Sequence, residues 1–214
     1  MFFPVIVYFL VFKYGPIAGN IVAFKQYNFA DGIWGSPWVG FKQFEMLFAN
    51  PQALQIIRNT LMLSLLQILI GFPFPILLAI MLNEVRSAWF KRSVQTLVYL
   101  PHFLSWVIIG GIVVTLFANS GFINSILKSW FGESFPFLYQ QGSWISIFVG
   151  SGIWRNAGWS AIIYLAALSS IDPHLYEAAS IDGAGKFRKI WHITLPGISS
   201  VVVLMFILNM GQVM

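Results

Sequence analysis

Five long apolar stretches, separated by more polar ones, dominate the pattern of this chain. Each approaches or exceeds the about 20 helical residues that span the hydrocarbon core of a bilayer. The first has no basic leading region and no small-residue cleavage site, so it is predicted to be a membrane helix and not a signal peptide. We therefore predict an all-α fold, a polytopic bundle of transmembrane helices. The five predicted spans are residues 1–24, 60–82, 93–118, 145–170 and 197–214.

Composition supports this class independently. Hydrophobic residues make up 58% of the chain and charged residues only 9%, against about 25% charged residues in an average soluble domain. The chain has no cysteine, which excludes disulfides and thiolate metal sites. The net charge of +5 would suggest nucleic acid in a soluble protein, but in a membrane protein it is typical of cytoplasmic loops. We expect a lipid bilayer as the partner and no nucleic acid.

Proline and glycine interrupt three of the predicted spans. The first is interrupted by Lys13 and by Gly15-Pro16. Gly71, Pro73 and Pro75 lie near the middle of the second span, which is therefore predicted to be kinked or locally unwound. Pro101 predicts a further kink in the third span. The adjacent glycines at 110–111 are expected to allow close contact with another helix.

Basic loops give the predicted orientation. Residues 83–92 form a short turn with three basic side chains, and the positive-inside rule places such a turn in the cytoplasm. Residues 172–196 carry three further basic side chains and are predicted to be cytoplasmic too. The connections at 25–58 and 119–143 are then external.

Two short helices are expected in the external connections. The aromatic and apolar residues between 41 and 48 fit a helix at the membrane interface, with a loop packed on helix ends as the alternative. Residues 123–131 fit a short amphipathic helix that rests against the membrane.

Residues 172–196 contain the clearest local structural signals in the chain. Asp172, followed by a proline, predicts a helix start with an N-cap. Gly183 can supply a left-handed turn at the end of that helix. A second helix is predicted over 185–193, with its basic side chains facing water or lipid headgroups, and Pro196 is expected to mark a change of chain direction.

A family resemblance rests on the same segment. The spacing EAA-x3-G-x9-I-x-LP is present in residues 177–196, and it resembles the signature loop of ABC importer permeases of the binding-protein-dependent type. Three other stretches are similar to the carbohydrate branch of that family, in particular to permeases for complex oligosaccharides. They are residues 38–44, 99–106 and 153–168.

The resemblance implies a fold, a location and a set of partners. The fold is the type I importer permease bundle, like that of maltose and methionine permeases, in one permease domain over 1–214 that includes the coupling loop 172–196. Further sequence is expected at the C-terminus and before the N-terminus. The implied location is the bacterial cytoplasmic (inner) membrane. The implied partners are a second, related permease (a homodimer is the alternative), two cytoplasmic ATPase subunits and an external solute-binding protein that docks on 25–58 and 119–143.

The resemblance further implies that each ATPase grips a short coupling helix. In this chain Glu177 would cap or pair with the ATPase surface, Ala178 and Ala179 would allow a close approach, and Gly183 would hold the bend. The implied coupling residues are Tyr176, Glu177, Ala178, Ala179, Asp182, Gly183, Ile193, Leu195 and Pro196.

The chain is predicted not to be an enzyme. The GAGK sequence at 183–186 is not a phosphate loop, because Ser180 stands where the motif requires Gly and Phe187 where it requires Ser or Thr. No metal-ligand spacing is present either. We therefore expect no cofactor in this chain, with ATP and Mg bound by the partner ATPase.

Arg155 is the most informative candidate for contact with cargo. A guanidinium in lipid is costly unless it faces a partner or water, so it is expected to point into the bundle or to lie near an interface. Aromatic faces and planar donors suit a sugar site, and an Arg can pair with a uronate; an Arg that extends to the outer headgroups is the structural alternative. The candidate pathway residues are Trp154, Arg155, Asn156 and Trp159, with Asn59, Gln67 and Asn209 as weaker candidates that, like His102, also suit interhelical hydrogen bonds.

The sequence leaves the cargo open. We expect an oligosaccharide importer that works by alternating access, but amino acids, phosphate or peptides are alternative cargoes for the same architecture. The sequence is also compatible with an ion-coupled secondary transporter and with a purely structural membrane subunit.

Overall fold

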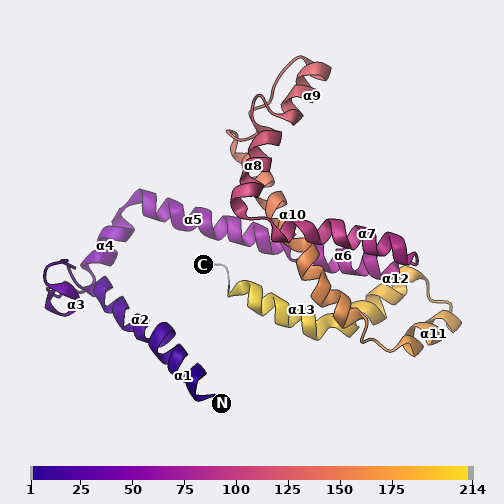
Figure 1. Cartoon of the computed structure of the whole chain (residues 1–214), viewed down its shortest axis with the longest axis horizontal. Coiled ribbons are helices and arrows are strands. Elements are labelled where there is room, and N and C mark those ends of the chain that lie inside the picture. Colours follow the sequence, from indigo (N-terminus) through magenta and orange to yellow (C-terminus); the bar gives the residue numbers. More distant parts are fainter. Residues whose placement is uncertain (1, 212–214) are drawn as a thin grey trace. The chain divides into compact units, whose positions relative to one another are not determined.

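The computed structural model describes residues 2–211, which form helices joined by turns (Figure 1). This confirms the predicted all-α class: the described residues contain no β-strand, only one isolated bridge between Lys25 and Trp38. The chain divides into two compact units, Met1–Asn59 and Thr60–Met214.

The first unit begins with a continuous run of helical turns from Phe3 to Phe24. A cluster of aromatic side chains follows. Phe24 stacks on Trp38 at 5.8 Å between ring centroids and also contacts Phe41 and Phe44. The helix predicted between 41 and 48 is present as α4. The elements are α1 (Phe3–Phe9), η1 (Leu10–Tyr14), α2 (Gly15–Ile17), η2 (Ala18–Phe24), α3 (Gly32–Gly35) and α4 (Lys42–Ala49).

The helix α5 contains the boundary between the units, and the second unit holds the remaining helices. The short helix predicted at 123–131 is present as α9. The elements are α5 (Pro51–Leu66), η3 (Gln67–Gly71), α6 (Pro73–Glu84), α7 (Ala88–Tyr99), η4 (Leu100–Phe103), α8 (Trp106–Phe117), α9 (Phe122–Phe131), α10 (Gln141–Leu168), α11 (Pro173–Ile181), α12 (Lys186–Lys189), η5 (Ile190–Thr194) and α13 (Leu195–Met210).

Four segments of the described chain are long and apolar enough to cross a membrane: Phe3–Phe24, Pro51–Glu84, Trp106–Phe131 and Lys186–Met210. The fourth predicted span, 145–170, lies largely in α10, an unbroken helix of 28 residues that is not among these four segments. The helix that contains the second predicted span begins earlier, at Pro51 and not at 60. The helix predicted over 185–193 is present, but it is continuous with the last predicted span in the segment Lys186–Met210. Polar residues at a helix end keep the helical conformation where the sequence pattern alone suggests a loop.

Turns of π-helix accommodate the prolines inside the long helices. A proline lacks the N–H group, and its ring clashes with the carbonyl of the residue four positions earlier. In η1, η3 and η5 the residue four positions before the proline is the middle residue of the π turn. The wider turn moves its carbonyl away from the proline ring, so the helix continues. The predicted interruption of the second span is thus confirmed. The three prolines, each two residues after its π turn, are Pro16, Pro73 and Pro196.

The third predicted span is interrupted more strongly than a kink. After α7 the chain forms the short 3-10 turn η4, which contains the buried Pro101, and Leu104 and Ser105 are extended. Ser105 then caps a new helix, because its hydroxyl accepts a hydrogen bond from the Ile108 amide at 3.3 Å. A single helix over 93–118 is therefore wrong, and two helices, α7 and α8, meet at a break.

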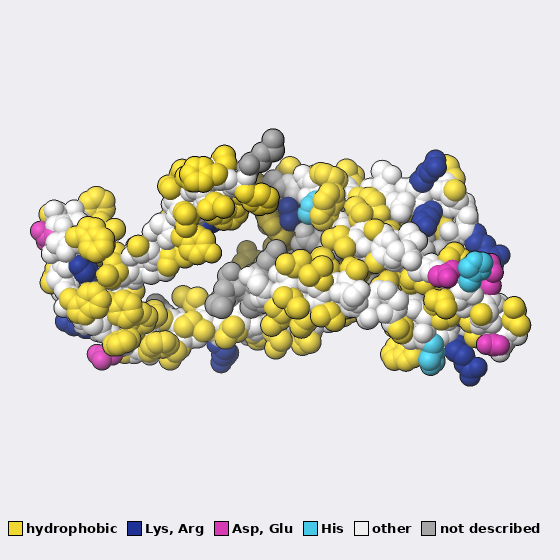
Figure 2. Space-filling model, turned by 90° about the horizontal axis from the view of Figure 1, so that it is seen from below, with side chains coloured by type: hydrophobic (Ala, Val, Ile, Leu, Met, Phe, Trp, Pro, Cys, Tyr) yellow, Lys and Arg dark blue, Asp and Glu magenta, His cyan; other side chains and the backbone are white. Residues whose placement is uncertain are grey.

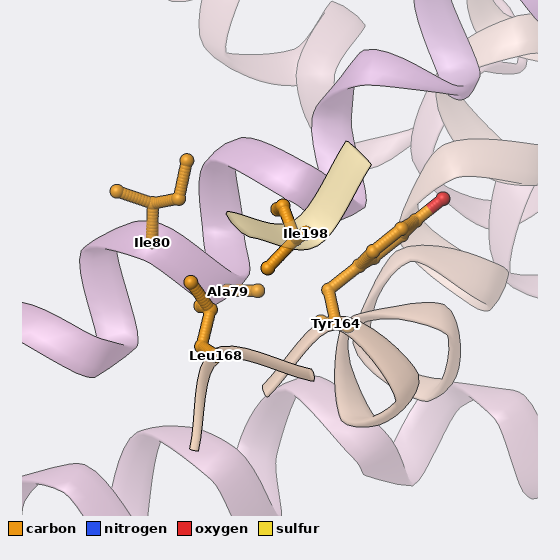
Figure 3. Close-up of a cluster of buried hydrophobic side chains, with 6 residues drawn as sticks. Ala79, Ile80, Tyr164, Leu168 and Ile198 are labelled. Atoms are coloured by element: carbon orange, nitrogen blue, oxygen red, sulfur yellow. The ribbon is translucent and has the colours of Figure 1, made fainter. Parts of the chain in front are cut away.

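Helix α10 forms the centre of the second unit, where it packs against α6, α7 and α13 (Figure 1). Its buried Tyr164 and Leu168 lie against Ala79 of α6 and Ile198 of α13 (Figure 3). Since Tyr164 and Leu168 are four residues apart, they share one face of the helix. This cluster connects the last described membrane-spanning segment to the second.

A glycine on α10 allows the closest helix contact of this unit. A Cβ atom added to Gly158 would overlap the carbonyl oxygen of Val98 on α7. By contrast, a Cβ at Gly110 or Gly111 would meet nothing within 4 Å. The close helix contact predicted at 110–111 is therefore absent within the described chain. Gly158 provides such a contact instead.

We predict that Gly158→Ala lowers the free energy of unfolding by about 1–3 kcal/mol, because α10 must move away from α7. The matched control is Gly150→Ala on the same helix, where an added Cβ meets nothing within 4 Å; it should gain up to about 1 kcal/mol from helix propensity. Denaturant unfolding of the purified protein in detergent measures both. Equal stability of the two variants would contradict the close approach.

Candidate functional site

Charged side chains gather at one end of the second unit, which carries α11 and α12 (Figure 2). Of the charged residues in 60–214, only Lys128, Glu133 and Arg155 lie outside 84–92 and 172–189. An ion pair of 3.8 Å between Lys186 and Glu84 shows that the two groups lie side by side. The two loops predicted to be cytoplasmic therefore share one end of the unit.

The helix α11 has well-defined ends, as its sequence predicts. The Asp172 carboxylate accepts a hydrogen bond from the His174 amide at 2.9 Å, and Pro173 occupies the first turn. At the other end Gly183 has a φ of +74°, and the Ala184 amide donates to the Ala179 carbonyl at 2.8 Å. This arrangement is a Schellman motif, which requires a left-handed residue.

The two sides of α11 face different surroundings. Glu177, Ala178 and Ile181 are exposed, and Ile181 is 88% exposed. The carboxylate of Glu177 lies 3.4 Å from His174 in the same helix. The exposed side of α11 thus presents an acid, a small residue and an apolar residue to a partner.

The other side of α11 faces the helix that follows it. Tyr176 and Ala179 are half-buried, so Ala179 is not on the free side. The Tyr176 hydroxyl lies 3.0 Å from the Thr194 hydroxyl, and Lys189 donates to the Ser180 hydroxyl at 2.6 Å. Lys189 was expected to face water or headgroups; it is half-buried, and its ammonium also contacts α11. The sequence carried no signal for Thr194, Lys189 and Ser180 as contacts of this loop.

The remaining coupling candidates lie in or near the turn after α11 and in one long helix. Asp182 ends α11, and α12, η5 and α13 form one helical segment, Lys186–Met210. Ile193 and Leu195 are half-buried in this segment, and Pro196 lies in its interior. The helical conformation continues through Pro196 after the π turn, and the chain bends between α12 and α13 (Figure 1).

Arg155 points into the second unit and lies at the break between α7 and α8. Its Nε donates to the Leu104 carbonyl at 3.3 Å, and its Nη1 donates to the Asn156 side chain at 3.3 Å. The guanidinium also lies 4.8 Å from the centre of the Trp106 ring. Because Leu104 and Ser105 are extended, the Leu104 carbonyl is outside any helix, and Arg155 supplies its hydrogen-bond donor.

Trp159 lies one turn further along α10 and contacts the same break. Its ring stacks on His102 at 4.6 Å with an interplanar angle of 3°, and Phe103 packs edge-on against it. The Nδ1 atom of His102 is buried without a hydrogen-bond partner. From the sequence, His102 was expected to suit an interhelical hydrogen bond, whereas its contact with α10 in the structure is a ring stack.

The other pathway candidates do not join this cluster. Trp154 faces a largely apolar groove of about 600 Å³ between α8 and α10. Gln67, in η3, packs against Gly152 of α10, where an added Cβ would lie 2.9 Å from its Nε2 atom. Asn209 donates to the Met205 carbonyl of its own helix at 2.8 Å. Asn59 belongs to the first unit.

Long apolar helices, with most of the charged residues of 60–214 gathered in the loops at one end, define a multi-pass helical membrane protein. The chain belongs to the family of binding-protein-dependent transport system inner membrane components, which matches residues 71–214. The family and the fold confirm the resemblance seen in the sequence.

Individual relatives cover almost the whole chain. It is 49% identical, over 99% of its length, to the polygalacturonan/rhamnogalacturonan transport system permease protein YteP of Bacillus subtilis strain 168, and it spans 66% of that protein. A crystal structure of a bacterial ABC transporter involved in the import of the acidic polysaccharide alginate contains a chain with a TM-score of 0.89 and 43% identity. That match covers 99% of this chain and 71% of the other.

A second crystal structure shows a bacterial alginate ABC transporter in complex with a periplasmic protein that carries an alginate pentasaccharide. Its matching chain has a TM-score of 0.88 and 43% identity, and the match covers 98% of this chain and 69% of that chain.

Proposed function

We propose that this chain is the transmembrane permease subunit of an ATP-driven importer for acidic oligosaccharides in a bacterial inner membrane. An external solute-binding protein delivers the cargo to the side of 25–58 and 119–143. Two cytoplasmic ATPase subunits supply the energy, and a second, related permease completes the pathway. Alternating access then follows from rigid-body motion of the helices.

The observation that carries the proposal is the shape of α11 within a chain of this family. Its start is fixed by Asp172 and its end by Gly183, and one side of it is free. A short helix with defined ends and an exposed acid, small residue and apolar residue suits a groove on a partner protein. Glu177, Ala178 and Ile181 would face the ATPase, while Tyr176 and Ala179 face the permease itself.

The acidic character of the proposed cargo rests on Arg155 and on the relatives. One relative belongs to a transporter involved in the import of the acidic polysaccharide alginate, and another is named for polygalacturonan and rhamnogalacturonan. The contacts with Leu104 and Asn156 use two of the five N–H donors of the guanidinium. Donors therefore remain for a carboxylate, and the aromatic rings of Trp106 and Trp159 suit the faces of sugar rings.

Gly183→Val is expected to leave membrane insertion intact and to reduce uptake by the assembled transporter about tenfold or more. A β-branched residue is strongly disfavoured at a φ of +74°, so the bend after α11 would change. The matched control is Gly185→Val: Gly185 has a φ of −70° and a ψ of 168°, and a Cβ there meets nothing within 4 Å.

Uptake into proteoliposomes and copurification of the ATPase subunits measure this effect. Near-normal uptake by Gly183→Val, or equal losses in both variants, would count against coupling through α11. If no ATPase copurifies with the unmodified permease, the proposed function itself is wrong.

Arg155→Gln is expected to lower the preference for acidic over uncharged cargo about tenfold, since a charged hydrogen bond contributes about 1.5–3 kcal/mol. The measurement compares uptake of a galacturonate oligosaccharide with uptake of its methyl-esterified, uncharged form. Lys128→Gln, outside the α7–α8 break, is the control for a change in net charge. If Arg155→Gln slows both cargoes equally, Arg155 supports the break between α7 and α8 and does not bind cargo.

A further inference from the structure

Four residues link α11 to the helix that follows it in a closed ring of hydrogen bonds. The Tyr176 hydroxyl bonds the Thr194 hydroxyl at 3.0 Å, and the Thr194 hydroxyl donates to the Lys189 carbonyl at 3.4 Å. The Lys189 ammonium donates to the Ser180 hydroxyl at 2.6 Å, which in turn donates to the Tyr176 carbonyl at 2.6 Å. We call these residues the four-residue ring.

Core packing does not hold α11, because the helix has no buried residue. Its connection to the rest of the unit therefore depends on its two flanking turns and on the four-residue ring. On the side before α11, Ile171 packs close to α13: a Cβ added to Gly197 would lie 2.8 Å from its Cδ1 atom.

The ring meets the core of the second unit at Thr194. This residue is only 4% exposed and is the last residue of the π turn η5. Ile198, four residues later on the same side of the helix, is fully buried against Ala79 and Tyr164 (Figure 3). Thr194 therefore lies one helical turn from the core cluster, on the same side of a continuous helix that packs against α6 and α10.

A separate ion pair joins the long helix to α6. Lys186, in the first turn after the bend, pairs with Glu84 at the end of α6 at 3.8 Å. Both side chains are exposed to solvent, so this pair is weak, and the part-buried hydroxyl pair has the larger role.

We propose that Tyr176 and Thr194 are positioning residues that make α11 and the long helix Lys186–Met210 move as one body. The inference deepens the proposed function and rests on it: a motion that a partner imposes on α11 passes through the four-residue ring into the membrane-spanning helix. The exposed side of α11 receives the partner, and the ring side transmits the motion.

Thr194→Val removes the hydroxyl but keeps the shape of the side chain, whereas Thr194→Ser keeps the hydroxyl. Thr115→Val is the matched control, because the Thr115 hydroxyl bonds only within its own helix, to the Gly111 carbonyl at 2.9 Å. Lys189→Met is a second variant that opens the ring at another position. All are made in the full-length permease and assembled with its partner subunits.

Hydrogen exchange of the α11 amides is the first measurement, and it needs only the permease. Loss of one net hydrogen bond should raise exchange about fivefold in Thr194→Val and in Lys189→Met, with less than a roughly twofold change in Thr194→Ser and Thr115→Val. Uptake per ATP hydrolysed is the second measurement. It should fall about fivefold in the first two variants, with ATPase copurification unchanged, and return to normal in Thr194→Ser.

The proposal requires both effects. Unchanged exchange in Thr194→Val means that the ring does not hold α11. Faster exchange with unchanged uptake per ATP means that the ring holds the helix but does not transmit motion, and this also overturns the proposal. Absence of ATPase from the unmodified complex refutes the proposed function, while the exchange measurement still decides whether the ring restrains α11.

Discussion

A proline inside a helix clashes with the carbonyl of the residue four positions earlier and breaks or kinks the helix unless the backbone adjusts. This chain meets that constraint with π turns placed so that the clashing carbonyl is the middle one of the turn. The π turn before Pro196 keeps the last described helix continuous with the segment before it. Because the helix continues, the polar segment after Gly183 and the last described span form one body, Lys186–Met210.

The second unit combines that long helix with one rigid contact and one break. Gly158 lets α10 approach α7 closely, and the cluster around Tyr164 joins α10 to α6 and α13. After α7, the chain is extended at Leu104, where Arg155 supplies the missing donor. A stiff centre beside a break supported by a charged side chain is a suitable basis for a pathway that opens and closes.

The sequence predicted the elements with local causes and missed those that depend on partners distant in the chain. The N-cap at Asp172 and the left-handed Gly183 follow from backbone chemistry that neighbouring residues reveal. The helix start at Pro51 was missed because polar helix ends and loops have similar composition, and the helix predicted over 185–193 was not recognised as continuous with the last span. Thr194 was missed as a contact of Tyr176, since an 18-residue separation has no periodic signal, and Arg155 was singled out without its contacts at Leu104 and Trp106.

The central claim is that the exposed side of α11 contacts an ATP-hydrolysing partner. The most direct test places a photo-crosslinking amino acid at Ile181, which is 88% exposed, and separately at Trp130 of α9, which is 78% exposed. In the assembled transporter, position 181 is expected to crosslink to the ATPase subunit and position 130 is not. Crosslinking of the ATPase from position 130, or its absence from position 181, would contradict docking of the ATPase on α11.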